Sequence, residues 1–199
     1  IETKGLLTQF FLKRNDPREI LISRDKIKFE DLKPKSIIGT SSFRREFQIK
    51  KKRKDIDCKL IRGNVDTRLK KLNEGLYNAI LLSSAGIKSL KLDNEITQIF
   101  QIDEIVPSAG QGVISMQCRE NDFEVIELLK KINDPDTLKC AIAERDVLKV
   151  LEGDCETAVG AHSIIDGNNI IVEAELFSLD GLKRFYEKRS EKIEKFKEI

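Results

Sequence analysis

Short apolar runs alternate with amphipathic stretches along the first half of the chain. The apolar runs have the length of buried strands and are rich in Ile and Leu. The predicted strands are 6–12, 19–23, 36–38, 59–61 and 79–82. The intervening stretches favour helices, which we expect over 42–53, 65–73 and 84–90. Strands that alternate with helices in this way are typical of a parallel or mixed sheet covered on both faces.

The pattern changes in the second half of the chain, where longer helices and hairpins replace the regular alternation. A Gly110-Gln111-Gly112 turn precedes a short strand, and two amphipathic helices follow it. Beyond Gly153, apolar runs are joined by Gly, Asn and Asp residues that are typical of hairpin turns. The elements predicted here are a strand over 113–117, helices over 123–132 and 136–151, strands over 161–165, 170–175 and 185–189, and a helix from Ser190.

These patterns predict three parts. An α/β domain is expected over 18–106, a linking segment over 107–132, and a small α+β domain over 133–199. The chain also begins directly with an apolar strand pattern, which suggests that residues upstream of it are missing.

Composition changes this picture little. The 199 residues are 40% hydrophobic and 35% charged, with a formal net charge of +2, as in charge-rich globular proteins. No apolar run approaches the roughly 20 residues that a membrane-spanning helix needs. The one His and the four Cys show no CxxC pair, so the spacing of a zinc site is absent. Cys58, Cys118 and Cys140 lie in apolar stretches, which predicts buried thiols and a reducing compartment.

Arginines cluster at two strand-to-helix turns. Arg44 and Arg45 follow the first turn, and Arg62 and Arg68 flank the second. Helix N-termini attract anions, and open α/β sheets bind ligands at the carboxyl ends of their strands. Because guanidinium groups pair with carboxylates through two parallel hydrogen bonds, we predict a pocket for a ligand that carries several carboxylates.

Cys155 differs from the other cysteines because it lies in a polar, Gly-flanked loop between a helix and a strand. The neighbouring Asp154 and Glu156 disfavour a thiolate, so Cys155 is poorly suited to be a nucleophile in turnover. A thiol that reacts once and keeps its adduct has no such requirement. An unreactive loop cysteine is the alternative.

Two other features favour structural interpretations. The basic run 50–54 lies at a predicted helix end, where cations are stabilised, and lacks the interleaved aromatic residues of a nucleic-acid platform. His162 has no neighbouring Cys or Ser that would suggest a hydrolase triad, so we interpret it as a structural strand residue.

Several motifs together closely resemble the signatures of the porphobilinogen deaminase family, also called hydroxymethylbilane synthases. They occur in the same order as in the family, and the resemblance extends over most of the chain. The motifs are Gly39-Thr40-Ser41-Ser42-Phe43-Arg44-Arg45, Leu60-Ile61-Arg62-Gly63-Asn64-Val65-Asp66-Thr67-Arg68, Gly110-Gln111-Gly112 and Glu152-Gly153-Asp154-Cys155.

The resemblance implies a transferase of haem and tetrapyrrole biosynthesis. Such an enzyme joins four porphobilinogen molecules into linear hydroxymethylbilane and releases ammonia. The resemblance further implies a dipyrromethane cofactor, held by a thioether to Cys155, and a second domain resembling half of a type II periplasmic-binding-protein fold. The side chains implied to hold the acetate and propionate groups are Ser41, Ser42, Arg44, Arg45, Arg62 and Arg68.

The chain also departs from the family pattern. Residues 1–17 would be a remnant of the family's first domain, to which 107–132 would return, and the catalytic Asp is expected in an N-terminal segment that this chain lacks. No residue here is therefore assigned as catalytic, and no metal is expected. Ala158 replaces the usual Pro, which loosens the loop, and Ser89 replaces an Arg of many relatives, which removes one carboxylate partner.

Two alternatives belong to other classes of protein. A non-catalytic small-anion-binding module of periplasmic-binding-like fold would bind its ligand without a covalent adduct. A nucleic-acid binder acting through 50–54 would show a steep salt dependence. The favoured reading is a monomer with porphobilinogen as its small-molecule substrate and no nucleic-acid or membrane partner. It is cytoplasmic, with a plastid-like organelle as the alternative location.

Overall fold

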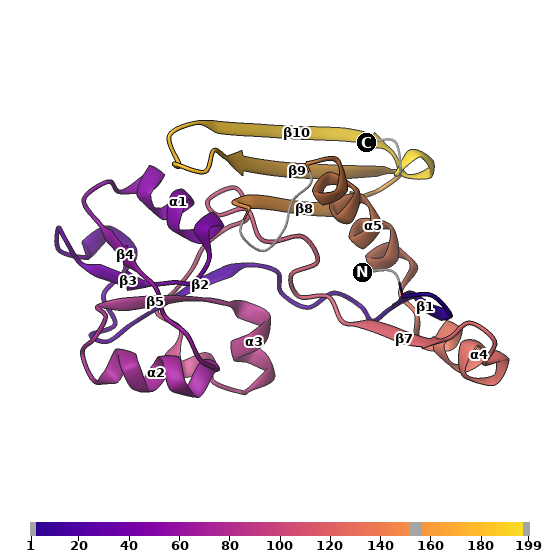
Figure 1. The fold of residues 1–199 in the computed structure, drawn as a ribbon, viewed down its shortest axis with the longest axis horizontal. Helices are drawn as coiled ribbons and strands as arrows, with labels where there is room; N and C mark the ends of the chain where they lie inside the picture. The colour runs from indigo at the N-terminus through magenta and orange to yellow at the C-terminus, as the bar shows by residue number, and fades with distance from the viewer. Residues whose placement is uncertain (1–2, 152–156, 197–199) are drawn as a thin grey trace.

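The computed structural model describes residues 3–151 and 157–196. Figure 1 shows a larger α/β part, a separate C-terminal sheet, and a small strand-and-helix part to which the first strand belongs. No helix within the described ranges is long and apolar enough to cross a membrane.

A mixed five-stranded sheet forms the centre of the larger part. Its strand order is β4-β3-β5-β2-β6. β3 is parallel to β4 and β5, whereas β2 is antiparallel to both of its neighbours, so the expected mixed sheet is confirmed. The strands are β2 (Glu19–Ser23), β3 (Ile37–Gly39), β4 (Asp57–Lys59), β5 (Ala79–Ser83) and β6 (Gln98–Ile99).

Helices cover both faces of this sheet because its central strands are apolar on both sides. α1 (Phe43–Lys52) packs on one face, while α2 (Val65–Asn73) and α3 (Ser84–Ser89) pack on the other (Figure 1). Successive residues of β2 alternate between the two cores: Leu21 joins the cluster under α1, and Ile20 joins the cluster under α2 and α3.

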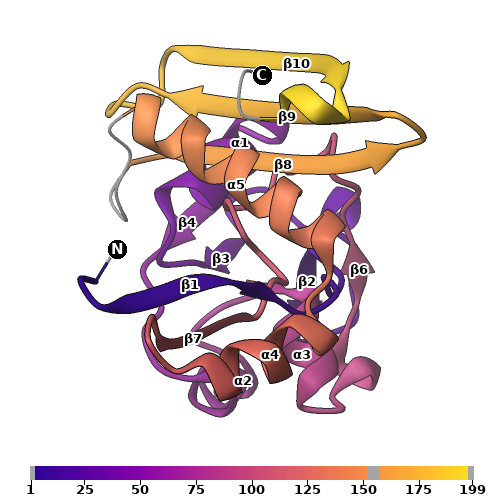
Figure 2. The same cartoon turned by 90° about the vertical axis from the view of Figure 1, so that its right-hand side faces the viewer.

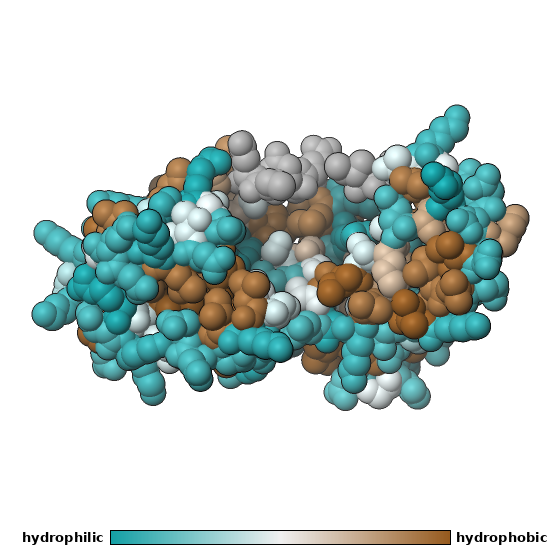
Figure 3. Space-filling model, turned by 90° about the horizontal axis from the view of Figure 1, so that it is seen from below, coloured by the Kyte–Doolittle hydropathy of each residue, from teal (hydrophilic) through white to brown (hydrophobic). Residues whose placement is uncertain are grey.

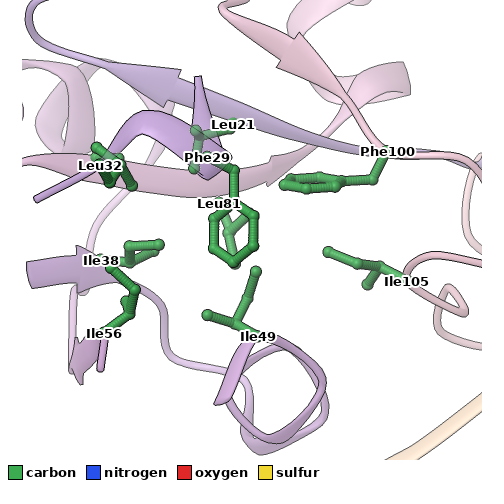
Figure 4. Close-up of a cluster of buried hydrophobic side chains, with 10 residues drawn as sticks. Leu21, Phe29, Leu32, Ile38, Ile49, Ile56, Leu81, Phe100 and Ile105 are labelled. Carbon is green, nitrogen blue, oxygen red and sulfur yellow. The ribbon is translucent and has the colours of Figure 1, made fainter. Parts of the chain in front are cut away.

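The cluster under α1 fixes the point where the chain leaves this domain. Phe29 meets Phe100 edge to face, with ring centroids 5.7 Å apart and an interplanar angle of 77° (Figure 4). Ile49 of α1 and Ile105 belong to the same cluster, and both are fully buried. The backbone beyond Ile105 is therefore held close to α1.

A smaller part contains the first strand of the chain and the strand that follows the mixed sheet. β1 (Leu6–Phe11) pairs antiparallel with β7 (Ser115–Arg119), and α4 (Phe123–Ile132) packs against both strands. Phe123 and Leu128 of α4 are exposed by 75% and 55%, which is unusual for large apolar side chains. Figure 3 shows an apolar patch over this part of the molecule.

The C-terminal part is a three-stranded antiparallel sheet backed by one helix. The order is β10-β9-β8, and α5 lies between this sheet and β1 (Figure 2). Asp134 caps α5 by accepting a hydrogen bond from the Thr137 amide at 2.7 Å. The elements are α5 (Pro135–Val150), β8 (Val159–Asp166), β9 (Asn169–Phe177) and β10 (Arg184–Lys192).

Several details of the predicted elements were wrong, and the strand predicted over 113–117 lies two residues later, at β7. The helix predicted from Ser190 is a continuation of β10, because Ser190 pairs with Ile171 of β9, and only a 3-10 turn follows at Ile193–Lys195. The strand predicted at 59–61 lies at β4, two residues earlier, where parallel pairing with β3 sets its register. The two-residue β6 had no sequence signal of its own.

One buried carboxylate connects these parts. Glu144 of α5 is fully buried and accepts hydrogen bonds from Arg14 Nη1 at 2.5 Å and Arg14 Nη2 at 3.1 Å. It also accepts from the backbone amides of Gly110 and Ser163, both at 2.7 Å, and from Ser163 Oγ at 2.9 Å. Arg14 lies on the segment between β1 and β2, and Gly110 lies on the segment between β6 and β7; we call these two the crossing segments. Ser163 lies in β8, so Glu144 connects the C-terminal sheet to both crossing segments.

His162 lies beside this carboxylate in a buried position. Its Nδ1 is 3.7 Å from Glu144 Oε1, beyond hydrogen-bonding distance, and has no hydrogen-bond partner among the described residues. Burial, and then the positive charges of Arg14 and Lys188, lower the pKa of His162 to about 3. The imidazole is therefore neutral in the folded protein at neutral pH.

Removing the Glu144 carboxylate should strongly destabilise the fold. Glu144→Ala removes the acceptor of both Arg14 Nη groups and of two backbone amides, so we expect a loss of about 3–5 kcal/mol in the free energy of unfolding. Urea denaturation measures it. The control is Glu127→Ala in α4, whose side chain is 66% exposed and pairs with Lys130, and which should change stability by less than about 0.5 kcal/mol. Equal effects would contradict this role of Glu144.

Stability should decrease as the pH falls through the range where His162 is protonated only in the unfolded chain. Between pH 6.5 and about 3 the unfolded state binds a proton that the folded state does not, so acidification favours unfolding. The slope is at most about 1.4 kcal/mol per pH unit. His162→Gln should remove this component, so urea denaturation at pH 6.5 and 4.5 should show a smaller loss for the variant. Parallel pH profiles would show that His162 makes no such contribution.

Candidate anion-binding site

Three helices begin along one edge of the mixed sheet, where the parallel strands β3, β4 and β5 end. α1 is capped by Ser42, whose Oγ accepts a hydrogen bond from the Arg45 amide at 3.4 Å. α2 is capped by Asn64, whose Oδ1 accepts from the Thr67 amide at 2.9 Å. The two predicted turns are therefore confirmed as capped helix N-termini that lie at the same edge.

A buried glutamate holds both arginines of the first turn. Glu19 of β2 is fully buried, and its Oε1 accepts a hydrogen bond from Arg44 Nη2 at 2.7 Å. Its Oε2 forms an ion pair with Arg45 Nη2 at 2.9 Å. Burial alone would raise the pKa of Glu19, but the charges of Arg45 and Arg44 outweigh it and hold the pKa below its usual range. Glu19 is thus a permanent anion between two guanidinium groups.

Arg44 faces the interior of the protein. Only 4% of it is exposed, and Nη1 donates a hydrogen bond to the Val106 carbonyl at 2.7 Å while Nη2 binds Glu19. The sequence predicts Arg44 as a carboxylate ligand. In the structure its guanidinium lies between Glu19 of β2 and the Val106 carbonyl, where the chain leaves the mixed sheet.

Arg45 has unused hydrogen-bonding capacity. Its Nη1 makes a long contact of 3.4 Å with the Leu81 carbonyl, and its Nε is buried without a hydrogen-bond partner among the described residues. A buried donor without an acceptor is costly. Arg45 therefore has the chemistry to bind a ligand oxygen.

The second turn brings another guanidinium close to Arg45. Arg68 Nε donates to the Gly63 carbonyl at 2.8 Å, which folds the side chain back over the N-terminus of α2. Burial, and then the positive charge of Arg45, lower the pKa of Arg68. Two guanidinium groups that repel each other in a partly buried setting favour an anion between them.

The remaining predicted ligands lie around this pair. Ser41 is exposed just before the cap Ser42. Arg62 is exposed, and its carbonyl accepts from Lys71 Nζ at 2.9 Å. Cys155 lies outside the described residues. The structure thus brings together Ser42, Arg45 and Arg68, whereas Arg44 is directed inward.

Two acidic residues of the site are not predicted from the sequence. Glu19 sits in an apolar strand pattern, where its burial gave no separate signal. Asp16 precedes β2 and accepts hydrogen bonds from Arg18 Nε at 2.9 Å, Ser84 Oγ at 3.0 Å and Lys88 Nζ at 2.8 Å. The hydrogen bond from Arg18 is the main cause that holds the pKa of Asp16 well below its usual range. Asp16 thus pairs with the cations of Arg18 and Lys88 and connects the start of β2 to α3.

Other chemistry finds no support in the described part of the chain. Within residues 3–151 and 157–196, no group of three or more His, Cys, Asp or Glu side chains is placed to hold a metal ion. Ser89 donates its hydroxyl to the Ala85 carbonyl of its own helix at 2.8 Å. The site is therefore built from guanidinium groups, hydroxyls and helix N-termini.

Two family models match the chain. Residues 2–127 match the model described as porphobilinogen deaminase, dipyromethane cofactor binding domain. Residues 138–199 match the model of the porphobilinogen deaminase C-terminal domain.

Curated relatives with the same name come from several bacteria. The porphobilinogen deaminase of Coxiella burnetii (strain RSA 493 / Nine Mile phase I) is 43% identical over 176 residues, which is 88% of this chain and 57% of the relative. That of Thiobacillus denitrificans is 40% identical over 178 residues, 89% of this chain and 58% of the relative. The chain thus spans less than two thirds of the length of these relatives.

Solved structures show a weaker likeness. An arginine-specific periplasmic binding protein of Salmonella typhimurium is 16% identical with a TM-score of 0.38, and covers 72% of this chain and 58% of its own. Substrate binding domain 2 of Lactococcus lactis GlnP is 18% identical with a TM-score of 0.38, and covers 73% and 56%.

Proposed function

The chain belongs to the porphobilinogen deaminase family, and from this premise we propose that it is part of an enzyme that joins porphobilinogen into linear hydroxymethylbilane with release of ammonia. The observation that carries the proposal is the position of Arg45 and Arg68 on two helices that begin at the same edge of the sheet, with Arg45 Nε lacking a hydrogen-bond partner among the described residues. Each pyrrole of the substrate has an acetate and a propionate, so a growing chain needs repeated cationic partners.

The matched domain is a dipyromethane cofactor binding domain, and the residues present fit such a group. Its carboxylates would be held by Arg45 and Arg68, with Ser41, Ser42 and Arg62 around them. Cys155 is proposed to hold the group through a thioether, which needs no activated thiol after attachment. When bound, the cofactor supplies the pyrrole carbon to which the first porphobilinogen is joined.

The chain's own residues contribute binding and orientation. Arg45 and Arg68 neutralise carboxylates, and the N-termini of α1 and α2 add backbone donors and favourable dipoles. Arg44 and Glu19 hold Arg45 and the start of α1 in place, so that little reorganisation is needed when a ligand binds. We assign no residue of this chain as the proton donor for the leaving amine. We propose that the donor lies in a region that corresponds to the part of the longer relatives not covered by this chain.

The domain boundaries are part of the same proposal. We propose that residues 1–17 and 107–132 belong to a first domain, 18–106 to a second and 133–199 to a third. The pairing of β1 with β7 and the exposed apolar residues of α4 support this assignment, since a surface of this kind is normally covered. We also propose a cytoplasmic location, and the free thiols of Cys58, Cys118 and Cys140 are consistent with a reducing compartment.

Removing Arg45 should weaken porphobilinogen binding. A hydrogen bond to a charged group contributes about 1.5–3 kcal/mol, so Arg45→Ala should raise the dissociation constant about ten- to a hundredfold by calorimetry. The control is Arg189→Ala in β10, where the side chain is 67% exposed and forms an ion pair with Glu187; its affinity should be unchanged. Equal affinities for the two variants would contradict the role of Arg45.

The cofactor proposal is tested by mass. The intact mass of the purified chain should exceed the sequence mass by a dipyrrole, and Cys155→Ser should abolish this increase. Cys58→Ser is the matched control and should retain the adduct, since burial raises the pKa of the Cys58 thiol to about 12. Carboxylate binding that is indifferent to Cys155→Ser, with no added mass in the unsubstituted chain, would favour the non-catalytic anion-binding module instead.

A further inference from the structure

Side chains in the middle of α1 hold the backbone of a single residue, Val106. The Val106 amide donates a hydrogen bond to Gln48 Oε1 at 2.6 Å, and Gln48 Nε2 donates back to the Val106 carbonyl at 3.0 Å. Arg44 Nη1 donates to the same carbonyl at 2.7 Å. Arg44 and Gln48 are four residues apart on one helix face, and both are almost fully buried. The backbone that leaves the α/β domain is therefore fixed to α1 by three hydrogen bonds.

The first residues of β8 are seated on this same backbone. The Ala161 amide donates a hydrogen bond to the Pro107 carbonyl at 2.9 Å. Gly160 lies so close that a Cβ atom there would be 2.8 Å from the Val106 oxygen. Only glycine permits that approach. The backbone carbonyls of Val106 and Pro107 thus determine where β8 begins.

A second contact sets the same register between α1 and the C-terminal sheet. The ring of Phe47 in α1 packs against Phe177 of β9, with centroids 5.8 Å apart. A Cβ on Gly181 would lie 2.7 Å from the Phe47 ring, so this turn also needs glycine for close approach. Lys51 Nζ is 3.7 Å from a carboxylate oxygen of Glu175. Side chains on both sides of Gln48 therefore touch the C-terminal sheet.

We propose that Gln48 is a positioning residue that links the anion-binding end of α1 to strand β8. It acts through the backbone of Val106 and Pro107 and holds β8 at a fixed distance from Arg45. Cys155 precedes Val159 by four residues in the sequence and lies outside the described residues. The inference rests on the proposed function, in which both ends hold the same ligand.

Hydrogen exchange at the Ala161 amide reports the link directly. Gln48→Leu keeps an apolar stem but loses both side-chain hydrogen bonds to Val106, so exchange at Ala161 should accelerate about tenfold while core amides such as Leu21 stay protected. Gln48→Glu keeps the acceptor for the Val106 amide and should have a smaller effect. The control is Gln117→Leu in β7, which removes a hydrogen bond to Thr8 and should leave Ala161 unchanged.

Gly160→Ala provides an independent variant in case Gln48→Leu fails to fold. Its added Cβ meets the Val106 oxygen, so β8 must shift away with Gln48 intact, and exchange at Ala161 should again accelerate. Unchanged exchange at Ala161 in a folded Gln48→Leu chain, or in Gly160→Ala if the former does not fold, would overturn the proposal.

Porphobilinogen as a probe separates positioning from general stability. Binding should slow exchange at the Arg45 and Ala161 amides of the unsubstituted chain, because coupling between two sites is reciprocal. In Gln48→Leu it should slow exchange only at Arg45. Protection at Arg45 without protection at Ala161 in the unsubstituted chain would overturn the link and leave the proposed function standing. Protection at neither amide would contradict the proposed function and the coupling, while the comparison without probe still decides whether Gln48 holds β8.

Discussion

The hydrogen bonds between Arg14 and Glu144 are the constraint on which this architecture depends. A buried carboxylate is stable only when its oxygens are well supplied with donors, and Glu144 draws them from both crossing segments and from β8. The same carboxylate therefore determines the path of the two crossing segments and the placement of the C-terminal sheet. Glu19 repeats this logic inside the α/β domain, where one buried anion orients the first turn of α1.

Much of the fold could be predicted from periodicity. α2 begins at Val65 and ends at Asn73 as expected, because an Asn cap and an apolar stripe mark it locally. The errors arise where pairing with a distant strand outweighs local preference. Ser190 lies in a charged stretch that resembles a solvated helix, yet it pairs with Ile171 of β9. No local pattern records such a partner.

The candidate site was partly predictable for a related reason. Arginines after strand ends indicated an anion pocket, and the structure places Arg45 and Arg68 close enough for their charges to interact. Which arginine faces inward depends on Glu19, whose contribution appears only once β2 lies beside α1. Arg44 and Arg45 are neighbours in sequence, but a helix turns successive side chains by about 100° and gives them different environments.

Strand β10 has a consequence for the behaviour of the molecule in solution. It is the outermost described strand of its sheet, and its residues are exposed and densely charged along Arg184–Lys192. An open strand edge offers unpaired backbone groups to any similar edge, and lysines placed along it oppose that pairing by repulsion and by their cost of desolvation. The charged edge of the C-terminal sheet therefore opposes edge-to-edge association with other copies into extended β-ribbons.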